Sequence, residues 1–146
     1  MNGLILATLL ATVLLAAVHD GRTGLIPDRL SLGGFSLICA LTALEGVFPE
    51  ALLGAVSAAA PMLALHLGTR GRGLGFGDVK LALPIGAALL LPAGLFALGA
   101  AFVIGAFAGI ALLLLSRAGT RSEIAFAPYL AAGTIVASIG HIERII

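Results

Sequence analysis

The longest stretch of the chain without a charged side chain covers 36 residues, 81–116. As one α-helix it would be about 54 Å long, at 1.5 Å per residue, whereas the hydrocarbon core of a bilayer is only about 30 Å thick. Within the stretch lies the sequence Leu91-Pro92-Ala93-Gly94, whose proline and glycine are residues that end helices. The stretch therefore predicts two membrane-spanning helices with a break near these residues.

Composition places the whole chain in the membrane class. Hydrophobic residues make up 60% of its 146 residues and charged residues only 10%, whereas a soluble domain carries roughly 25% charged residues. A soluble enzyme, a disordered segment and a nucleic-acid-binding protein are therefore excluded. The single cysteine, Cys39, also excludes a disulfide framework and a multi-cysteine zinc site.

Four further uncharged stretches are long enough, or nearly so, to cross a membrane as helices. They are residues 1–19, 30–44, 51–69 and 124–142. Together with the longest stretch they predict an all-α polytopic bundle of about six transmembrane helices, in which residues 1–146 form a single domain. The second and fourth helices are expected to be short. Five spanning helices with one re-entrant segment are the alternative.

The positions of the few charges define an orientation. Seven of the eight cations fall in three connections at one face of the predicted bundle: Arg22, Arg29, Arg70, Arg72, Lys80, Arg117 and Arg121. Only Arg144 lies at the other face. The positive-inside rule makes the cation-rich face cytoplasmic, which leaves both termini outside. All three aspartates of the chain, Asp20, Asp28 and Asp78, share that face.

The first of these connections, residues 19–29, places Asp20 where the first helix meets water. Pro27 favours an extended conformation for the preceding Ile26. Asp28 is expected either to cap the second helix, by accepting a hydrogen bond at its N-terminus, or to be a charge on the surface. Asp20, in contrast, occupies no position at which a helix requires a cap.

The second connection is rich in glycine, since five of the ten residues from 68 to 77 are Gly. Its spacing fits neither a dinucleotide-binding fingerprint nor a phosphate-binding loop. Gly75-Phe76-Gly77-Asp78 instead opens an apolar helix, and an aspartate in a first turn is favoured by the helix dipole. Lys80 does not share the helix face of Asp78. We expect Lys80 to extend to the membrane interface, or to orient the aspartates or the substrate.

Asp20 and Asp78 are more informative together than either is alone. Each would lie at the cytoplasmic end of a helix, and ionisable groups at membrane depth are functional candidates. Two carboxyl groups within a few ångströms of each other share a proton. One can then activate a water molecule while its protonated partner polarises a peptide carbonyl, which is the chemistry of an aspartic protease and needs no metal. A small proton-coupled carrier or channel subunit, or a membrane assembly factor without catalysis, are the alternatives.

Three segments resemble the prepilin peptidases, the GxGD-type intramembrane aspartic proteases that process type IV pilins. Gly75-Phe76-Gly77-Asp78-Val79-Lys80 is similar to the family's G-x-G-D-x-K motif. Asp20 followed by Ile26-Pro27-Asp28 resembles its first-aspartate segment. Residues 125–133 resemble the family segment F-G-P-[YF]-L-A-x-G, with Ala127 in place of the usual Gly. The three segments follow the order of the family and cover nearly the whole chain.

The resemblance implies an aspartic endopeptidase whose catalytic residues are Asp20 and Asp78. It gives a motif or substrate-positioning role to the other matched residues: Gly75, Gly77, Lys80, Ile26, Pro27, Asp28, Pro128 and Gly133. The implied substrate is a prepilin or pseudopilin, whose short basic leader is removed after a Gly on the cytoplasmic side of the inner membrane. The alternative is that Asp28, and not Asp20, is the first catalytic aspartate, although this requires a shift of eight residues from the motif match.

The expected partners are the prepilin substrate and the lipid bilayer, with no nucleic acid and no cofactor. Larger family members carry an N-terminal region with cysteine pairs that is associated with methylation of the new N-terminus. Because the chain begins at its first predicted helix, the resemblance implies a short form, for which S-adenosylmethionine is not expected. The spacing of Gly105 and Gly109 suits close helix packing within the bundle, or a dimer. His66, inside the third predicted helix, is expected to hydrogen-bond to a neighbouring helix.

Cysteine labelling tests the predicted topology. Three predicted helices separate Gly46 from Thr120, so these two positions should lie on opposite faces of the membrane. Cysteines introduced singly as Gly46→Cys and Thr120→Cys are therefore expected to react with a membrane-impermeant reagent from opposite sides. Labelling of both from the same side would contradict the six-helix arrangement.

Overall fold

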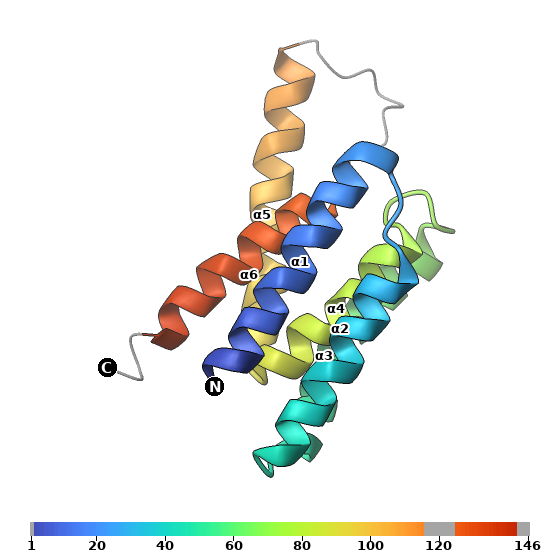
Figure 1. Ribbon diagram of the computed structural model, residues 1–146. Coiled ribbons are helices and arrows are strands. Elements are labelled where there is room, and N and C mark those ends of the chain that lie inside the picture. The colour runs from blue at the N-terminus through green and yellow to red at the C-terminus, as the bar shows by residue number, and fades with distance from the viewer. Residues whose placement is uncertain (1, 116–124, 143–146) are drawn as a thin grey trace.

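The computed structural model describes residues 2–115 and 125–142, which form α-helices and, over those residues, no β-strand. The helices are α1 Gly3–Thr23, α2 Asp28–Leu44, α3 Phe48–Gly68, α4 Phe76–Leu89, α5 Ala93–Leu114 and α6 Ala127–Ile142 (Figure 1). The predicted all-α bundle of six helices is confirmed. The break predicted near Leu91-Pro92 is also present, since α4 ends and α5 begins on either side of it.

Helix lengths divide the bundle into two groups. α1, α3 and α5, with 21, 21 and 22 residues, are long and apolar enough to cross a membrane. α2, α4 and α6 are shorter, with 17, 14 and 16 residues. The sequence predicted a short second and fourth helix, whereas the last helix is shorter than expected because it begins only at Ala127. At 1.5 Å per residue α4 is about 21 Å long, so the bilayer must thin around it or cover its ends.

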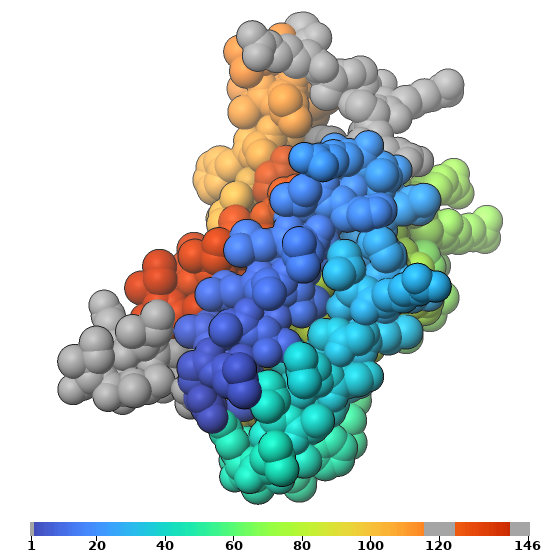
Figure 2. All heavy atoms as spheres, viewed as in Figure 1, coloured from blue at the N-terminus to red at the C-terminus, as the bar shows by residue number. Residues whose placement is uncertain are grey.

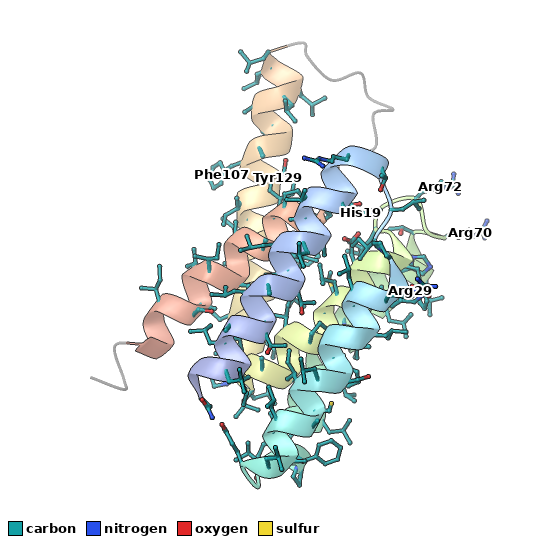
Figure 3. All side chains as sticks on the ribbon, viewed as in Figure 1. His19, Arg29, Arg70, Arg72, Phe107 and Tyr129 are labelled. Atoms are coloured by element: carbon teal, nitrogen blue, oxygen red, sulfur yellow. The ribbon has the colours of Figure 1, made fainter. Side chains whose placement is uncertain are left out.

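The outward faces of the long helices are apolar. Phe107 and Leu114 on α5 are 71% and 80% exposed, and Figure 3 shows Phe107 projecting away from the bundle. Leu4, Leu15 and Val18 are exposed in the same way on α1. An extended surface of this kind is favourable in lipid and unfavourable in water. The chain is therefore a membrane protein.

Successive helices alternate in direction, so that α1 ends where α2 begins and α3 ends where α4 begins, all at one end of the bundle (Figure 1). We call it the aspartate end, because Asp20, Asp28 and Asp78 all lie in these helix termini. Glu45, which follows α2, lies at the opposite end. The convergence of these helix termini brings together side chains that are far apart in the sequence.

Cations also lie at the aspartate end, as the charge pattern predicts. Figure 3 shows Arg29, Arg70 and Arg72 there, with Arg70 and Arg72 pointing away from the bundle. Three cations used in the orientation argument lie outside the described residues: Arg117, Arg121 and Arg144. Within the described part of the chain, the predicted clustering of the cations and the aspartates at one end is therefore confirmed.

α4 is the central helix of the bundle. It packs against each of the other five helices, and ten of its 14 residues are buried. α1 and α2 lie side by side over one face of the molecule (Figure 2). Because α4 carries Asp78 in its first turn, this aspartate is held by the core of the bundle rather than by a surface element.

Glycines allow α3 and α4 to cross in backbone contact. A Cβ atom added to Gly86 of α4 would overlap the carbonyl oxygen of Gly54 on α3, and one added to Gly54 would overlap that of Gly86. Gly94, at the start of α5, packs against the same point, where its added Cβ would lie 3.1 Å from the Gly86 Cα. Close approach at small residues is the usual basis of helix packing in membranes, where apolar side chains gain nothing by leaving lipid.

Small residues also join α5 to α6. A Cβ atom at Gly133 would overlap the Ala97 carbonyl of α5, and one at Gly105 would lie 3.2 Å from the Phe126 ring. Nothing lies within 4 Å of the corresponding position at Gly109. Of the two glycines predicted to serve helix packing or a dimer, Gly105 packs within the bundle and Gly109 has no close neighbour among the described residues.

Gly86→Ala tests the helix crossing. Its methyl group has no space beside Gly54, so the variant should be destabilised by about 1–3 kcal/mol, as is usual for overpacked cores. Gly99→Ala is the matched control, because nothing lies within 4 Å of its added Cβ, and it should be neutral or stabilising by up to about 1 kcal/mol. Unfolding in detergent measures both, and equal stabilities would contradict the backbone contact.

Candidate active site

Asp20 lies in the last turn of α1 and is only 7% exposed. The helix ends at Gly24, which has a left-handed conformation with φ of 67° and donates its N–H to the Asp20 carbonyl oxygen at 2.8 Å. Glycine is favoured at this position because it adopts positive φ without strain. The helix therefore ends three residues after Asp20, at Thr23. Because Asp20 is buried, its carboxylate points into the bundle rather than into solvent.

The start of α6 supplies a hydrogen bond to Asp20. The backbone N–H of Ala127, the first residue of α6, donates to the Asp20 Oδ2 at 3.1 Å, and this contact is buried. The first N–H groups of a helix have no partner within the helix, and the dipole there favours a negative charge. The third motif segment thus contacts the first aspartate directly. Ala127 is fully buried and has the N–H that a Gly at this position would also offer.

Asp78 is the third residue of α4 and is 6% exposed. Its own N–H donates to the Gly75 carbonyl at 3.2 Å, and a Cβ atom on Gly75 would lie 3.2 Å from its Oδ2. The other oxygen, Oδ1, is buried and has no hydrogen-bond partner among the described residues. Buried polar atoms are rarely left without a partner. An unpartnered carboxyl oxygen at the aspartate end is therefore available to a water molecule or a substrate.

The structure brings Asp20 and Asp78 together. α1 packs against α4, and both carboxyl groups are buried at the aspartate end. Asp28, by contrast, has a side chain that is 61% exposed and is engaged elsewhere. Of the two pairings left open by the sequence, the geometry favours Asp20 with Asp78. We refer to these two residues as the aspartate pair.

The expectation that Asp28 caps α2 is wrong. Pro27 occupies the N-cap position, no side chain of the described residues caps the helix, and Asp28 is its first residue. The Asp28 carboxylate instead accepts a hydrogen bond from Lys80 Nζ at 2.6 Å, which forms an ion pair between α2 and α4. The physical reason is that the helix begins one residue earlier than a cap at Asp28 requires, which places the Asp28 carboxylate in the first turn, where the helix dipole favours a negative charge. Lys80 Nζ also lies 5.0 Å from the centre of the Phe76 ring.

The connection between α1 and α2 packs on the first turn of α4. A Cβ atom on Gly77 would lie 3.1 Å from the Ile26 Cβ and 3.3 Å from its Cδ1. Gly77 therefore lets the Ile26 side chain rest against the helix backbone directly beside Asp78. This contact explains why a glycine precedes the aspartate, and it joins two motif segments that are about 50 residues apart.

Two histidines fix the connections on either side of the site. His66, at the end of α3, donates through Nδ1 to the Leu74 carbonyl at 2.8 Å, since a carbonyl can only accept. The sequence predicted that His66 would hydrogen-bond to a neighbouring helix. Its partner lies instead in the connection that follows α3. His19 donates in the same way to the Leu25 carbonyl at 2.9 Å. Sequence reasoning missed these contacts because they depend on the path of the connections.

The remaining matched residues lie in α6. Pro128 is its second residue, a position where the missing N–H costs nothing. Gly133 lies further along the helix, where it packs against Ala97 and Ala101 of α5. Pro128 thus adjoins the contact between α6 and Asp20, whereas Gly133 belongs to the interface that holds α6 in place.

A six-helix membrane protein with two buried aspartates at one end has the architecture and the acid pair of a membrane-embedded aspartic protease. Comparison with known proteins supports this class. Residues 7–110 match the type IV leader peptidase family. The chain belongs to this family and is a leader peptidase of the aspartic type, which favours a peptidase over the alternative of a proton-coupled carrier. No solved structure matches the chain significantly.

Curated relatives agree with the family. The leader peptidase HopD of Salmonella typhimurium is 36% identical over 131 residues, which cover 81% of each chain. Two proteins named prepilin leader peptidase/N-methyltransferase are 35% identical over 136 residues in Aeromonas hydrophila and 33% identical over 134 residues in Bacillus subtilis. The matches cover 88% of this chain but only 47% and 52% of those two proteins. The chain therefore spans about half the length of the two bifunctional relatives.

Gly77→Ala tests the packing of Ile26 beside Asp78. The added methyl group would push the connection away from α4, and a displacement of about 1 Å near reacting groups lowers rates by up to about 100-fold. Leader cleavage should slow, while Gly68→Ala, whose added Cβ has no atom within 4 Å, should cleave at the wild-type rate. Wild-type cleavage by Gly77→Ala would contradict a site built on this contact.

Proposed function

We propose that the aspartate pair catalyses hydrolysis of a peptide bond in a prepilin-like protein, after a Gly at the end of a short basic leader. The observation that carries the proposal is the burial of both carboxyl groups at one end of the bundle, where the Asp78 Oδ1 has no hydrogen-bond partner within residues 2–115 and 125–142. The prepilin substrate follows from the resemblance of the three motif segments and from the names of the relatives.

The proposed reaction uses water as the nucleophile. One carboxylate takes a proton from the water as its oxygen bonds to the scissile carbonyl carbon, and the protonated partner donates its proton to the carbonyl oxygen. The resulting tetrahedral diol collapses when the C–N bond breaks. The leaving nitrogen accepts the proton held by the first aspartate, and one hydroxyl of the diol gives its proton to the other, ionised aspartate, which leaves a carboxylic acid and a free amine. Every proton transfer stays within the two aspartates, the water and the peptide. No metal or organic cofactor takes part in these steps.

The proposed orientation places the aspartate end at the cytoplasmic face of the inner membrane, with both termini outside. It rests on the cations at that end, among them Arg22, Arg29, Arg70 and Arg72, and on the positive-inside rule. A substrate would keep its basic leader in the cytoplasm and its apolar helix in the bilayer, which brings the intervening peptide bond to the level of the aspartates. The glycine-rich connection before Asp78 would move to admit this peptide.

Replacement of either aspartate tests the catalytic assignment. Asp20→Asn and Asp78→Asn each remove an acid–base group, so cleavage of a purified prepilin should fall by about 100-fold or more. Glu45→Gln is the matched control, because it removes a carboxylate from the opposite end of the bundle, and it should leave the rate unchanged. Leader removal is followed by gel shift. Cleavage at the wild-type rate by either asparagine variant would disprove the assignment.

The pH dependence of cleavage provides a second test. At low pH both aspartates are protonated and no base remains, whereas at high pH both are ionised and no acid remains. The plot of kcat/KM against pH should therefore be bell-shaped, and its two limbs belong to the pair as a unit. A rate that rises monotonically with pH would contradict a shared proton.

A further inference from the structure

An ion pair joins the first turns of α2 and α4 at the aspartate end. Lys80 Nζ and Asp28 Oδ1 lie 2.6 Å apart, although 52 residues separate them in the sequence. The Asp28 side chain is 61% exposed and that of Lys80 is 22% exposed. Exposed ion pairs contribute little to the stability of a fold. Stability alone therefore does not account for a contact of such close geometry beside the aspartate pair.

The ion pair is one of two contacts that fix the beginning of α4. Lys80 lies two residues after Asp78. Gly77, which packs on Ile26, lies directly before Asp78. The two contacts hold the backbone on both sides of Asp78, and both are made with the segment from Ile26 to Asp28. Phe76 packs against Lys80, with 5.0 Å between Nζ and the ring centre, which limits the directions that the ammonium group can take.

The segment that holds α4 is itself tied to Asp20. The Gly24 N–H donates to the Asp20 carbonyl, and His19 donates to the Leu25 carbonyl at 2.9 Å. These bonds tie the connection to the end of α1 as far as Leu25, three residues before Asp28. A displacement of Asp28 relative to Lys80 would change the separation of Asp20 and Asp78.

We propose that Asp28 and Lys80 are positioning residues, whose ion pair sets the separation of the two aspartates by fixing the first turn of α4 against the connection between α1 and α2. The inference rests on the proposed catalytic role of Asp20 and Asp78. Neither Asp28 nor Lys80 touches the peptide bond, and each acts only through the other. Loss of the pair therefore affects the chemical step and not the binding of substrate.

Steady-state kinetics of the full chain in detergent with a prepilin substrate test this inference. Lys80→Met and Asp28→Asn should each lower kcat about tenfold or more and leave KM nearly unchanged, because the aspartates are misplaced while substrate contacts remain. Arg72→Met is the matched control: it removes a cation from the same end of the bundle, where Arg72 points away from it, and it should retain the wild-type kcat.

Two further variants separate the positioning role from others. The double variant Asp28→Asn/Lys80→Met should be no slower than the slower single variant, because residues that act only through each other show no additive loss. Lys80→Arg should retain most of the wild-type kcat, since a guanidinium group also pairs with a carboxylate. If a single variant fails to fold, as judged by its thermal unfolding, the Lys80→Arg variant and the double variant still decide the question.

Several results would overturn the inference. These are a wild-type kcat in both single variants, a rise in KM alone, a loss of activity in Lys80→Arg as large as in Lys80→Met, and multiplied losses in the double variant. Asp20→Asn and Asp78→Asn are measured in the same assay. If these two remain active, the proposed function fails. If they are inactive while Lys80→Met and Asp28→Asn are fully active, only the positioning role fails.

Discussion

The carboxylate of Asp20 accepts a hydrogen bond from the backbone of Ala127, 107 residues away, and this contact joins the first helix of the bundle to the last. At membrane depth a carboxylate has little water to solvate it and needs a partner from the protein. The first N–H groups of a helix likewise have no hydrogen-bond acceptor within the helix. The two needs are met by one contact, which places the start of α6 over the end of α1.

The packing of α4 explains how the second aspartate reaches the same place. α4 is the shortest helix and touches all the others, and the glycine contact between Gly54 and Gly86 draws it against α3. Because it begins only two residues before Asp78, its short length sets the depth of that carboxyl group. A helix of about 21 Å in a bilayer core of about 30 Å keeps its first turn near or below the membrane surface.

Local sequence signals predicted most of the architecture. Uncharged stretches and one helix break sufficed for six helices, because hydrophobic length is a property of each segment alone. The placement of Asp20 and Asp78 at the same end of the bundle also followed from their position at the ends of predicted helices. The ion pair of Asp28 with Lys80 could not be predicted in this way, because capping rules consider only neighbouring residues and Lys80 is 52 residues away. The bond from Ala127 to Asp20 likewise depends on how distant helices pack, which no local pattern records.

Catalysis by the aspartate pair requires Asp20 and Asp78 to lie close together, and thiol cross-linking measures that proximity. In a chain with Cys39→Ala, the pair of substitutions Asp20→Cys and Asp78→Cys is treated in membranes with a short thiol cross-linker, and joined peptides are identified by mass spectrometry. The pair Asp20→Cys and Glu45→Cys, which lies at opposite ends of the bundle, serves as the control. The account predicts a cross-link between positions 20 and 78 and none between 20 and 45. A folded, membrane-inserted variant in which positions 20 and 78 do not cross-link would contradict it.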